Sequence, residues 1–296
     1  MSSAPHTTDW GVDSMTAPLR RVAMRRPGAI LTADHTRWHY AAPIDPDALT
    51  AQYDRFVALV EASGATIDWL DDGPLDDDLA DSVFTYDPSF MTPAGAVILR
   101  PGKALRRGEA DLHHRFYRDR IPVIGEIEAP GVAEGGDMFW LDPTTLAVGR
   151  GFRTDQAGID QLRAIVEPHG IAVEVYDLPY LHGPEACLHL LSVVSPLDHD
   201  LALVHAPLMP TALHQRMTTM GYRLLEAPAE EFEASLGLNL NVLALGPRRC
   251  LTIEGFDGTL RLMREAGCEV TTFPGDALCI PCEGGPTCLT RPLHRG

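Results

Sequence analysis

The chain has 296 residues, 45% of them hydrophobic and 22% charged, a composition typical of a globular protein with a large core. Asp and Glu total 41 against 24 Lys and Arg, a formal net charge of -17. This balance argues against nucleic acid as a partner, because neutralising phosphates needs a basic surface. No apolar run approaches the roughly 20 residues that span a bilayer, and the N-terminal sequence lacks the regions of a secretion signal. We therefore expect a cytoplasmic protein that does not enter a membrane.

The six cysteines are spread along the chain without the density of a disulfide scaffold, so we expect them to be reduced. Cys279 and Cys282 form a C-x-x-C motif. Zinc sites usually bring a second pair at defined spacing, and the sequence has none. The thioredoxin-like strand-to-helix context of a redox pair is also missing. The sequence therefore predicts neither a metal site nor a redox site at this motif.

A short apolar strand, a turn, an amphipathic helix and a second strand recur five times along the chain. In chain order these elements are expected at 22–24, 47–62 and 66–70; 96–99, 109–118 and 123–124; 146–148, 156–167 and 173–175; 201–204, 212–220 and 222–225; and 242–245, 258–266 and 270–273. The alternation indicates an α/β protein. Five similar units favour repetition around an axis, although a doubly wound sheet gives the same alternation. We expect one domain over 1–296, with 1–19 as a flexible N-terminal segment.

The segments that join the units contain most of the residues suited to catalysis. Repetition around an axis would bring these segments together at the centre. They contain Asp81 and Asp87 before the second unit, Glu134 and Asp137 before the third, Cys187 and His189 before the fourth, and Cys288 after the fifth.

Cys288 is the preferred nucleophile because it follows the pair Gly284-Gly285, and glycine permits close approach of the backbone to a ligand. A thiol has to become a thiolate to attack, and a nearby histidine or a bound cation promotes that change. His189 lies in another joining segment and is the candidate partner. The alternatives are an inert buried cysteine, a structural histidine, and acidic residues that cap turns.

Taken in order, these segments resemble the guanidino-group modifying superfamily, the penteins, which includes arginine deiminases, amidinotransferases and dimethylarginine dimethylaminohydrolases. The resemblance runs from about Arg21 to Pro292, and it implies a five-module α/β propeller with pseudo-fivefold symmetry. The dimethylaminohydrolases are the most similar branch. The matching segments are Asp81-Ser-Val-Phe84 with Asp87, Leu99-Arg-Pro-Gly102 with Arg106-Arg107-Gly-Glu109, Arg153-Thr-Asp-Gln-Ala-Gly158, Leu188-His-Leu190 and Cys288.

Two positions depart from the patterns of these branches. Arginine deiminases and amidinotransferases typically carry an aspartate two residues after the histidine, where this chain has Leu191. The dimethylaminohydrolases usually carry Glu before the aspartate that corresponds to Asp87, where this chain has Tyr86. The segment around Cys288 resembles the deiminase ending, so the branch stays open. Tyr86 is expected beside the substrate, where the loss of a carboxylate would change the affinity or the preferred substituent.

The resemblance implies a catalytic cycle that uses Cys288, His189 and Glu134. Asp87 and Glu134 would hold the guanidinium while the Cys288 thiolate attacks its central carbon. His189 would protonate the leaving nitrogen and then activate water against a covalent thiouronium intermediate. The products would be a ureido amino acid such as citrulline, and an amine or ammonia.

The rest of the expected site recognises the substrate's amino-acid end. Arg106 and Arg153 would bind the α-carboxylate, since guanidinium groups pair bidentately with carboxylates. Asp81 would take the α-ammonium. The chemistry needs no metal or organic cofactor, and we expect a monomer or homodimer.

Three functions follow from this interpretation. The first is hydrolysis of an N-substituted arginine such as methylarginine. The second is deimination of arginine or amidino transfer to an amine. The third is a non-catalytic propeller that binds a cationic small molecule in its acidic centre.

Overall fold

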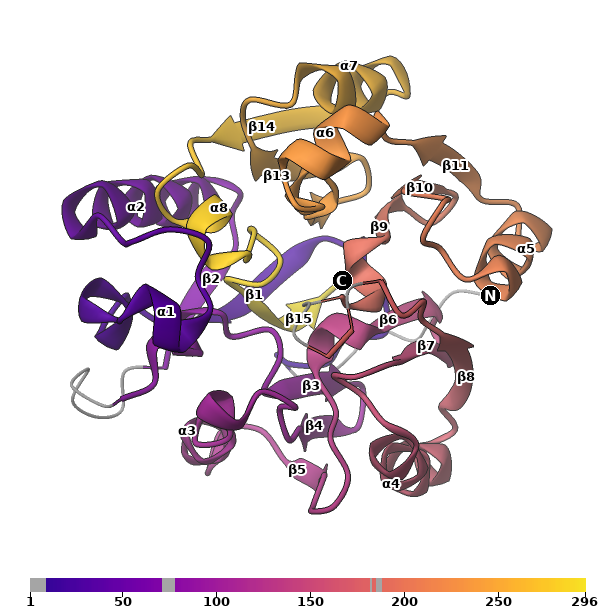
Figure 1. The fold of residues 1–296 in the computed structure, drawn as a ribbon. Helices are drawn as coiled ribbons and strands as arrows, with labels where there is room; N and C mark the ends of the chain where they lie inside the picture. Colours follow the sequence, from indigo (N-terminus) through magenta and orange to yellow (C-terminus); the bar gives the residue numbers. More distant parts are fainter. Residues whose placement is uncertain (1–8, 71–77, 182, 185–187) are drawn as a thin grey trace.

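Five three-stranded sheets surround a common axis in a computed structural model, which describes residues 9–70, 78–181, 183–184 and 188–296 (Figure 1). In sheet order the strands are β15 (Arg291–Arg295), β1 (Leu19–Met24) and β2 (Thr66–Trp69); β3 (Ser89–Thr92), β4 (Gly95–Ile98) and β5 (Val123–Glu126); β6 (Met138–Asp142), β7 (Thr145–Arg150) and β8 (Ala172–Asp177); β9 (Val194–Asp198), β10 (Leu201–Val204) and β11 (Arg223–Glu226); and β12 (Leu243–Gly246), β13 (Arg249–Ile253) and β14 (Glu269–Phe273). In every sheet the middle strand is antiparallel to the first and parallel to the third. The predicted five-module α/β propeller is confirmed.

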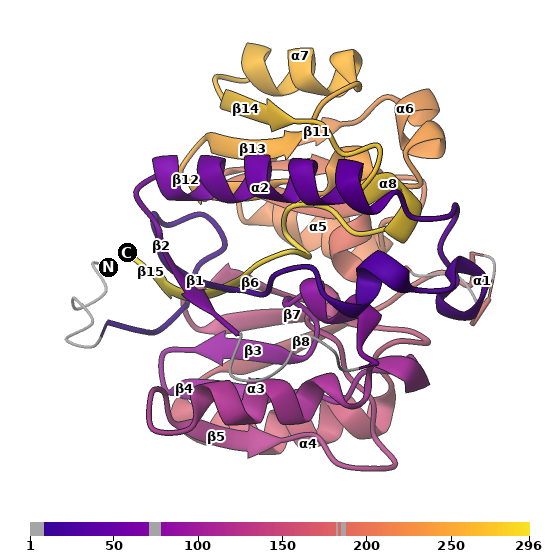
Figure 2. The ribbon, with the colours of Figure 1, turned by 90° about the vertical axis from the view of Figure 1, so that its left-hand side faces the viewer.

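Helices cover the outside of the ring, and each module has one that connects its two parallel strands (Figure 1). These are α2 (Pro46–Ala62), α3 (Glu109–Tyr117), α4 (Gln156–Val166), α5 (Thr211–Thr219) and α7 (Asp257–Glu265); the shorter helices are α1 (His35–Trp38), α6 (Ala229–Ala234) and α8 (Cys279–Cys282). Figure 2 shows β1, β2 and β15 at the end of the molecule opposite α1. None of the helices in the described part of the chain is long and apolar enough to cross a membrane.

Helix α2 illustrates why the local sequence folds as it does. The Asp45 side chain caps its first turn by accepting hydrogen bonds from two backbone N–H groups, and Pro46 occupies the first turn, where a missing N–H costs nothing. Leu49, Phe56 and Val60 are spaced to share one face, and all three are fully buried. Helix α2 therefore packs onto the ring through a single apolar stripe.

In each module, one of the first two strands was not predicted as a separate element. In the first four modules the predicted units begin at the middle strand. In the fifth, the predicted strand 242–245 corresponds to the first strand β12, and the middle strand β13 was missed. Both β12 and β13 are almost entirely buried, so neither shows the alternation of polar and apolar residues that identifies a half-exposed strand.

The described part of the N-terminal segment is packed against the ring, which differs from the expected flexible segment 1–19. Val12 is 5% exposed, Gly11 bridges to His294, and Leu19 already belongs to β1. The Gly11 N–H donates to the carbonyl of Leu293 at 2.7 Å. Residues 9–18 therefore extend the closure that β15 makes with β1.

Arg295 ties the ends of the ring together. It is 3% exposed, and its guanidinium donates to the carbonyls of Ala17 and Ala244 at 2.7 and 2.8 Å, so it connects the N-terminal segment with the fifth module. Burial lowers its pKa to about 10.

We expect Arg295→Met to lower the free energy of unfolding by about 2 kcal/mol, because two buried carbonyls lose their donors. Urea unfolding followed by circular dichroism measures this change. Arg249→Met, an exposed position on β13, is the matched control and should stay within about 0.5 kcal/mol of wild type. Equal stability of the two variants would contradict the role of Arg295.

Candidate active site

One pocket is lined by segments that join the modules, as the sequence predicted, and also by segments within the first three modules. It is lined by Trp38, His39, Tyr40, Asp81, Phe84, Asp87, Gly102, Lys103, Arg106, Phe152, Arg153, Pro184, His189, Cys282, Glu283, Gly284 and Cys288. We call it the seam pocket. The structure thus brings Asp81, Asp87, His189 and Cys288 to one cavity although they are up to 207 positions apart in the sequence. Cys187 lies outside the described residues.

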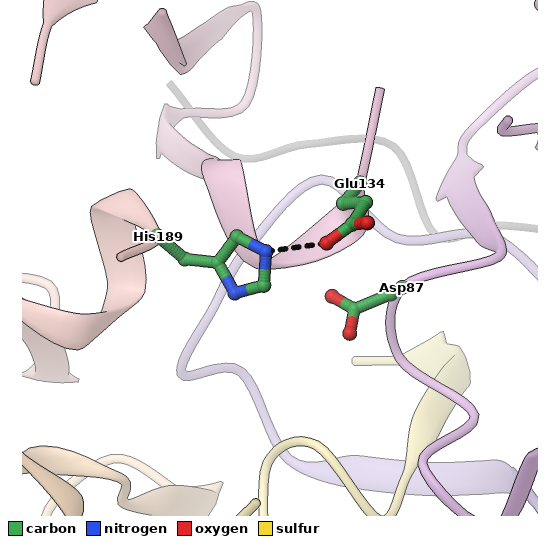
Figure 3. A group of neighbouring side chains, drawn as sticks. All are labelled: Asp87, Glu134 and His189. Carbon is green, nitrogen blue, oxygen red and sulfur yellow. Dashed lines mark hydrogen bonds and ion pairs between the residues drawn. The ribbon is translucent and has the colours of Figure 1, made fainter. Parts of the chain in front are cut away.

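Asp87, Glu134 and His189 point toward one another beside the pocket (Figure 3). A hydrogen bond of 2.7 Å joins His189 Nε2 to Glu134 Oε2. One ligand atom from each of the three residues lies within 4.8 Å of the others. The three residues come from the segments before the second, third and fourth sheets, so the cluster exists only when these modules meet.

Glu134 is fully buried and does not line the seam pocket. Its Oε1 accepts from Arg153 Nε at 3.0 Å and from the Gly102 N–H at 2.9 Å. Burial raises the pKa of Glu134, but Arg153 and His189 lower it more, so the net pKa falls below its ordinary value. Glu134 thus holds Arg153 and His189, and its expected contact with a substrate guanidinium stays a prediction.

A second buried acid supports the backbone after His189. Asp137 Oδ1 accepts from the Leu190 N–H at 2.9 Å, at the start of the short 3-10 helix Leu190–Ser192. The His189 N–H donates to Ser192 Oγ at 3.1 Å. Burial raises the pKa of Asp137 to about 6. Asp137 therefore helps to position His189 by holding the backbone N–H of the next residue.

Cys288 also lines the seam pocket, and Asn241 Nδ2 donates to its Sγ at 3.1 Å. Asn241 Oδ1 accepts from the Thr287 N–H at 2.9 Å, which fixes the amide. Burial raises the pKa of Cys288 to about 11, Asp87 adds to the rise, and Asn241 and His189 oppose it. Sequence reasoning missed Asn241, although it stands just before β12, where every other module begins with a candidate residue.

The glycine pairs Gly135-Gly136 and Gly284-Gly285 lie so close to other protein atoms that a side chain would not fit at these positions. A Cβ on Gly136 would lie 2.5 Å from His189 Nδ1, and one on Gly284 would lie 2.3 Å from the ring of Phe84. A Cβ on Gly285 would lie 2.5 Å from Asn241. The close approach predicted for these glycines is thus made by the residues that build the site.

Arg106 is 4% exposed and is bound mainly to protein acids. It donates to Asp87 Oδ2 at 2.6 Å, to Glu109 Oε2 at 2.9 Å and to the Phe84 carbonyl at 3.0 Å. Burial raises the pKa of Glu109 to about 7, and Arg106 opposes that rise. Arg106 lines the seam pocket, but its positive charge is balanced by two acids of the protein, Asp87 and Glu109. Its expected contact with a substrate carboxylate stays a prediction, as does that of Arg153.

Tyr86 faces a different cavity from the one expected. It lines a second cavity with Arg291, Trp140 and Leu191, which we call the Arg291 cavity, and it is absent from the seam pocket. The Arg291 guanidinium lies 3.8 Å from the centre of the Tyr86 ring and donates to the Tyr86 carbonyl. This stacking holds the Tyr86 ring in the Arg291 cavity. The two departures from the family pattern, at positions 86 and 191, therefore lie together outside the pocket.

Asp81 does line the seam pocket, but its carboxylate is already bound. Lys103 Nζ lies 2.6 Å from Oδ2, and the Tyr40 hydroxyl donates to Oδ1 at 2.7 Å. The expected pairing of Asp81 with a substrate ammonium stays a prediction, and such an ammonium would compete with the lysine ammonium that already binds this carboxylate. Sequence reasoning did not identify Lys103 or Tyr40.

The cluster of Asp87, Glu134 and His189 has donor atoms that also suit a divalent metal ion. Both acids, however, are engaged by guanidinium groups: Asp87 by Arg106 and Glu134 by Arg153. A metal would have to compete with two cations for the same oxygens. The donor set therefore fits a network of charged hydrogen bonds better than a metal centre.

Comparison with known proteins agrees with this architecture. The arginine deiminase family model matches residues 74–231. An N(G),N(G)-dimethylarginine dimethylaminohydrolase of Streptomyces coelicolor is 30% identical over 276 residues, covering 92% of this chain and 96% of that protein. The protein of the same name from Pseudomonas aeruginosa is 29% identical over 232 residues, covering 77% and 84%. The solved structure of a cysteine-to-serine mutant of the Pseudomonas aeruginosa protein, complexed with citrulline, covers 93% of this chain and 99% of that chain, with a TM-score of 0.76 at 22% identity.

These matches define the class of protein as a guanidino-group modifying, or pentein, propeller. Within that class, the chain belongs to the arginine deiminase family.

The raised pKa of Cys288 predicts a slow thiol in the absence of a bound cation. Because only the thiolate is alkylated, the rate with iodoacetamide should rise about tenfold per pH unit from pH 7 towards 11. Mass spectrometry of the peptide that contains Cys288 measures this rate separately from the other cysteines, and Cys288→Ser is the control. A rate that levels off below pH 9 would show that the thiolate is already stabilised in the free protein.

Proposed function

We propose that the protein is a cysteine-dependent hydrolase of a guanidino group in an arginine-like small molecule. The observation that carries the proposal is that Cys288, His189 and Asp87 line one pocket while Glu134 holds His189 from behind. Family membership supports the reaction class, because the relatives compared here are named for action on guanidines.

Asp87 is suited to hold the guanidinium. Its Oδ1 accepts from the Gly136 N–H at 2.9 Å and its Oδ2 accepts from Arg106, and a carboxylate has about four acceptor positions. Nearby charge keeps its pKa low despite burial, so it stays ionised. A guanidinium bound here would place a positive charge beside Cys288, which lowers the pKa of the thiol. The substrate would thus help to generate the nucleophile.

In the first half of the reaction, the Cys288 thiol releases its proton to water as the guanidinium binds, and its sulfur forms a bond to the central guanidinium carbon. His189 donates a proton to one nitrogen of the tetrahedral adduct, and the carbon–nitrogen bond breaks to release an amine or ammonia. The cysteine keeps the rest of the substrate as a thiouronium. Glu134, which remains ionised, stabilises the positive charge on His189 that precedes this transfer.

In the second half, His189 takes a proton from water, and the hydroxide attacks the thiouronium carbon. The carbon–sulfur bond breaks, the thiol is restored and a ureido product leaves. An N-substituted arginine, or arginine itself, would give citrulline. If an amine took the place of water, the same intermediate would give amidino transfer.

We expect wild-type protein to form ureido product from guanidino compounds, and Cys288→Ser to lose at least 1,000-fold in kcat while keeping its fold. A colorimetric ureido assay and circular dichroism measure the two properties. Cys268→Ser, a thiol of the fifth module outside the seam pocket, is the matched control and should stay active. Full activity of Cys288→Ser would show that Cys288 is not the nucleophile.

The other two functions have their own tests. Adding an amine acceptor and looking for a guanidinylated product tests for amidino transfer. Tight binding of a guanidino compound without any product would favour the non-catalytic function.

Glu134→Gln is expected to lower kcat about 100-fold with little change in KM, because His189 loses the charge that stabilises its protonated form. The basic limb of the pH profile of kcat/KM should move to lower pH, since His189 acts as a proton donor in the first half of the reaction and loses its proton more easily when the carboxylate is lost. Steady-state kinetics between pH 5 and 9 measure both effects. The control is Glu126→Gln, an exposed acid on β5. A rise in KM alone would instead assign Glu134 to substrate binding.

A further inference from the structure

We infer that Lys103 fills the ammonium site of the seam pocket, so that the substrate is a guanidino carboxylic acid without an ammonium group. The inference rests on the proposed function, because it concerns the far end of the same substrate. It differs from the pairing of Asp81 with an α-ammonium that the sequence implied.

Lys103 occupies a complete binding site for an ammonium ion. Its Nζ donates to Asp81 Oδ2 at 2.6 Å and to the Trp38 carbonyl at 2.7 Å. The same nitrogen lies 5.1 Å from the centre of the Trp38 ring and 5.7 Å from that of Tyr40. A carboxylate, a carbonyl and aromatic faces are the groups with which proteins bind alkylammonium ions. Here all of them are engaged by the protein's own ammonium.

Lys103 is also the only lysine in the sequence; every other residue among the 24 Lys and Arg is arginine. The two side chains are not equivalent, because lysine carries a compact ammonium with three donors and arginine a planar fork. The chain therefore uses an ammonium at one place, in the wall of the pocket. The position of the single lysine in the pocket wall supports a specific role for its ammonium there.

A substrate ammonium would meet unfavourable charge at this position. Asp81 is 5% exposed. The Tyr40 hydroxyl binds its Oδ1, and Arg106 Nε lies 4.0 Å from its Oδ2, the oxygen that Lys103 also binds. A second ammonium would have to displace Lys103 or share one carboxylate with it, and like charges at such a distance repel.

A substrate carboxylate, by contrast, finds a donor here. Two of the three Lys103 hydrogens have protein acceptors among the described contacts, and the side chain is 20% exposed towards the pocket. Arg153 lines the same end. Glu283 is the other acid at this end; burial raises its pKa, which favours its neutral form, while Lys103 and Arg153 oppose the rise.

The test compares three guanidines of similar length, each with and without an N-methyl group: 5-guanidinopentanoate, arginine and agmatine. The ureido assay gives kcat/KM for each. We expect 5-guanidinopentanoate to exceed arginine at least tenfold and agmatine to be the poorest substrate. Preference for arginine or agmatine over the acid would overturn the inference.

Lys103→Ala should reverse the preference, because it frees Asp81 and the Trp38 carbonyl for a substrate ammonium. We expect the ratio of kcat/KM for arginine to that for 5-guanidinopentanoate to rise at least tenfold. Lys103→Met keeps the length of the side chain without its charge and should change the ratio in the same direction, so a folding defect in one variant does not decide the outcome. Arg107→Ala, an exposed base nearby, is the control that should leave the ratio unchanged.

The two proposals fail in different ways. If wild-type protein forms no ureido product from any of these guanidines, the proposed function is wrong. If product forms but the ratio is unchanged in both Lys103 variants, the hydrolase stands and Lys103 does not select the substrate.

Discussion

The buried carboxylate of Glu134 constrains the whole site. An ionised acid removed from water has to be compensated by nearby charge and hydrogen bonds. Here the compensation comes from the backbone of Gly102 in the second module, from Arg153 in the third, and from His189 in the segment before the fourth. The position of one acid therefore fixes how three modules meet, and it also fixes the direction of the histidine that the proposed reaction uses.

Ring closure supplies the other half of the site. Cys288 stands three residues before β15, the C-terminal strand that pairs with β1 and completes the first sheet. Its carbonyl accepts from the Tyr86 N–H at 3.1 Å, which links the closing segment to the second module. The proposed nucleophile thus reaches Asp87 and His189 only in a closed ring. Stability and catalysis depend on the same closure.

The two departures from the family pattern, Tyr86 and Leu191, lie outside the seam pocket once they are placed in space. Tyr86 and Leu191 replace acids that relatives carry, yet both line the Arg291 cavity and neither lines the seam pocket. Lys103 lies in the pocket wall and binds Asp81 directly. Lys103 is therefore the residue that we infer to select the substrate, whereas Tyr86 and Leu191 pack in the Arg291 cavity.

The sequence by itself determined the number of modules, the positions of the connecting helices and six of the 17 residues that line the pocket. It could do so because helix α2, for example, is specified locally by its cap and by the spacing of Leu49, Phe56 and Val60. Only the tertiary structure decided which partner each side chain meets. Asp81 is bound by Lys103 from another segment, and Cys288 by Asn241 from another module. Such contacts join residues that are far apart in the sequence and depend on how the modules pack around the axis. A local pattern of residues does not predict that packing.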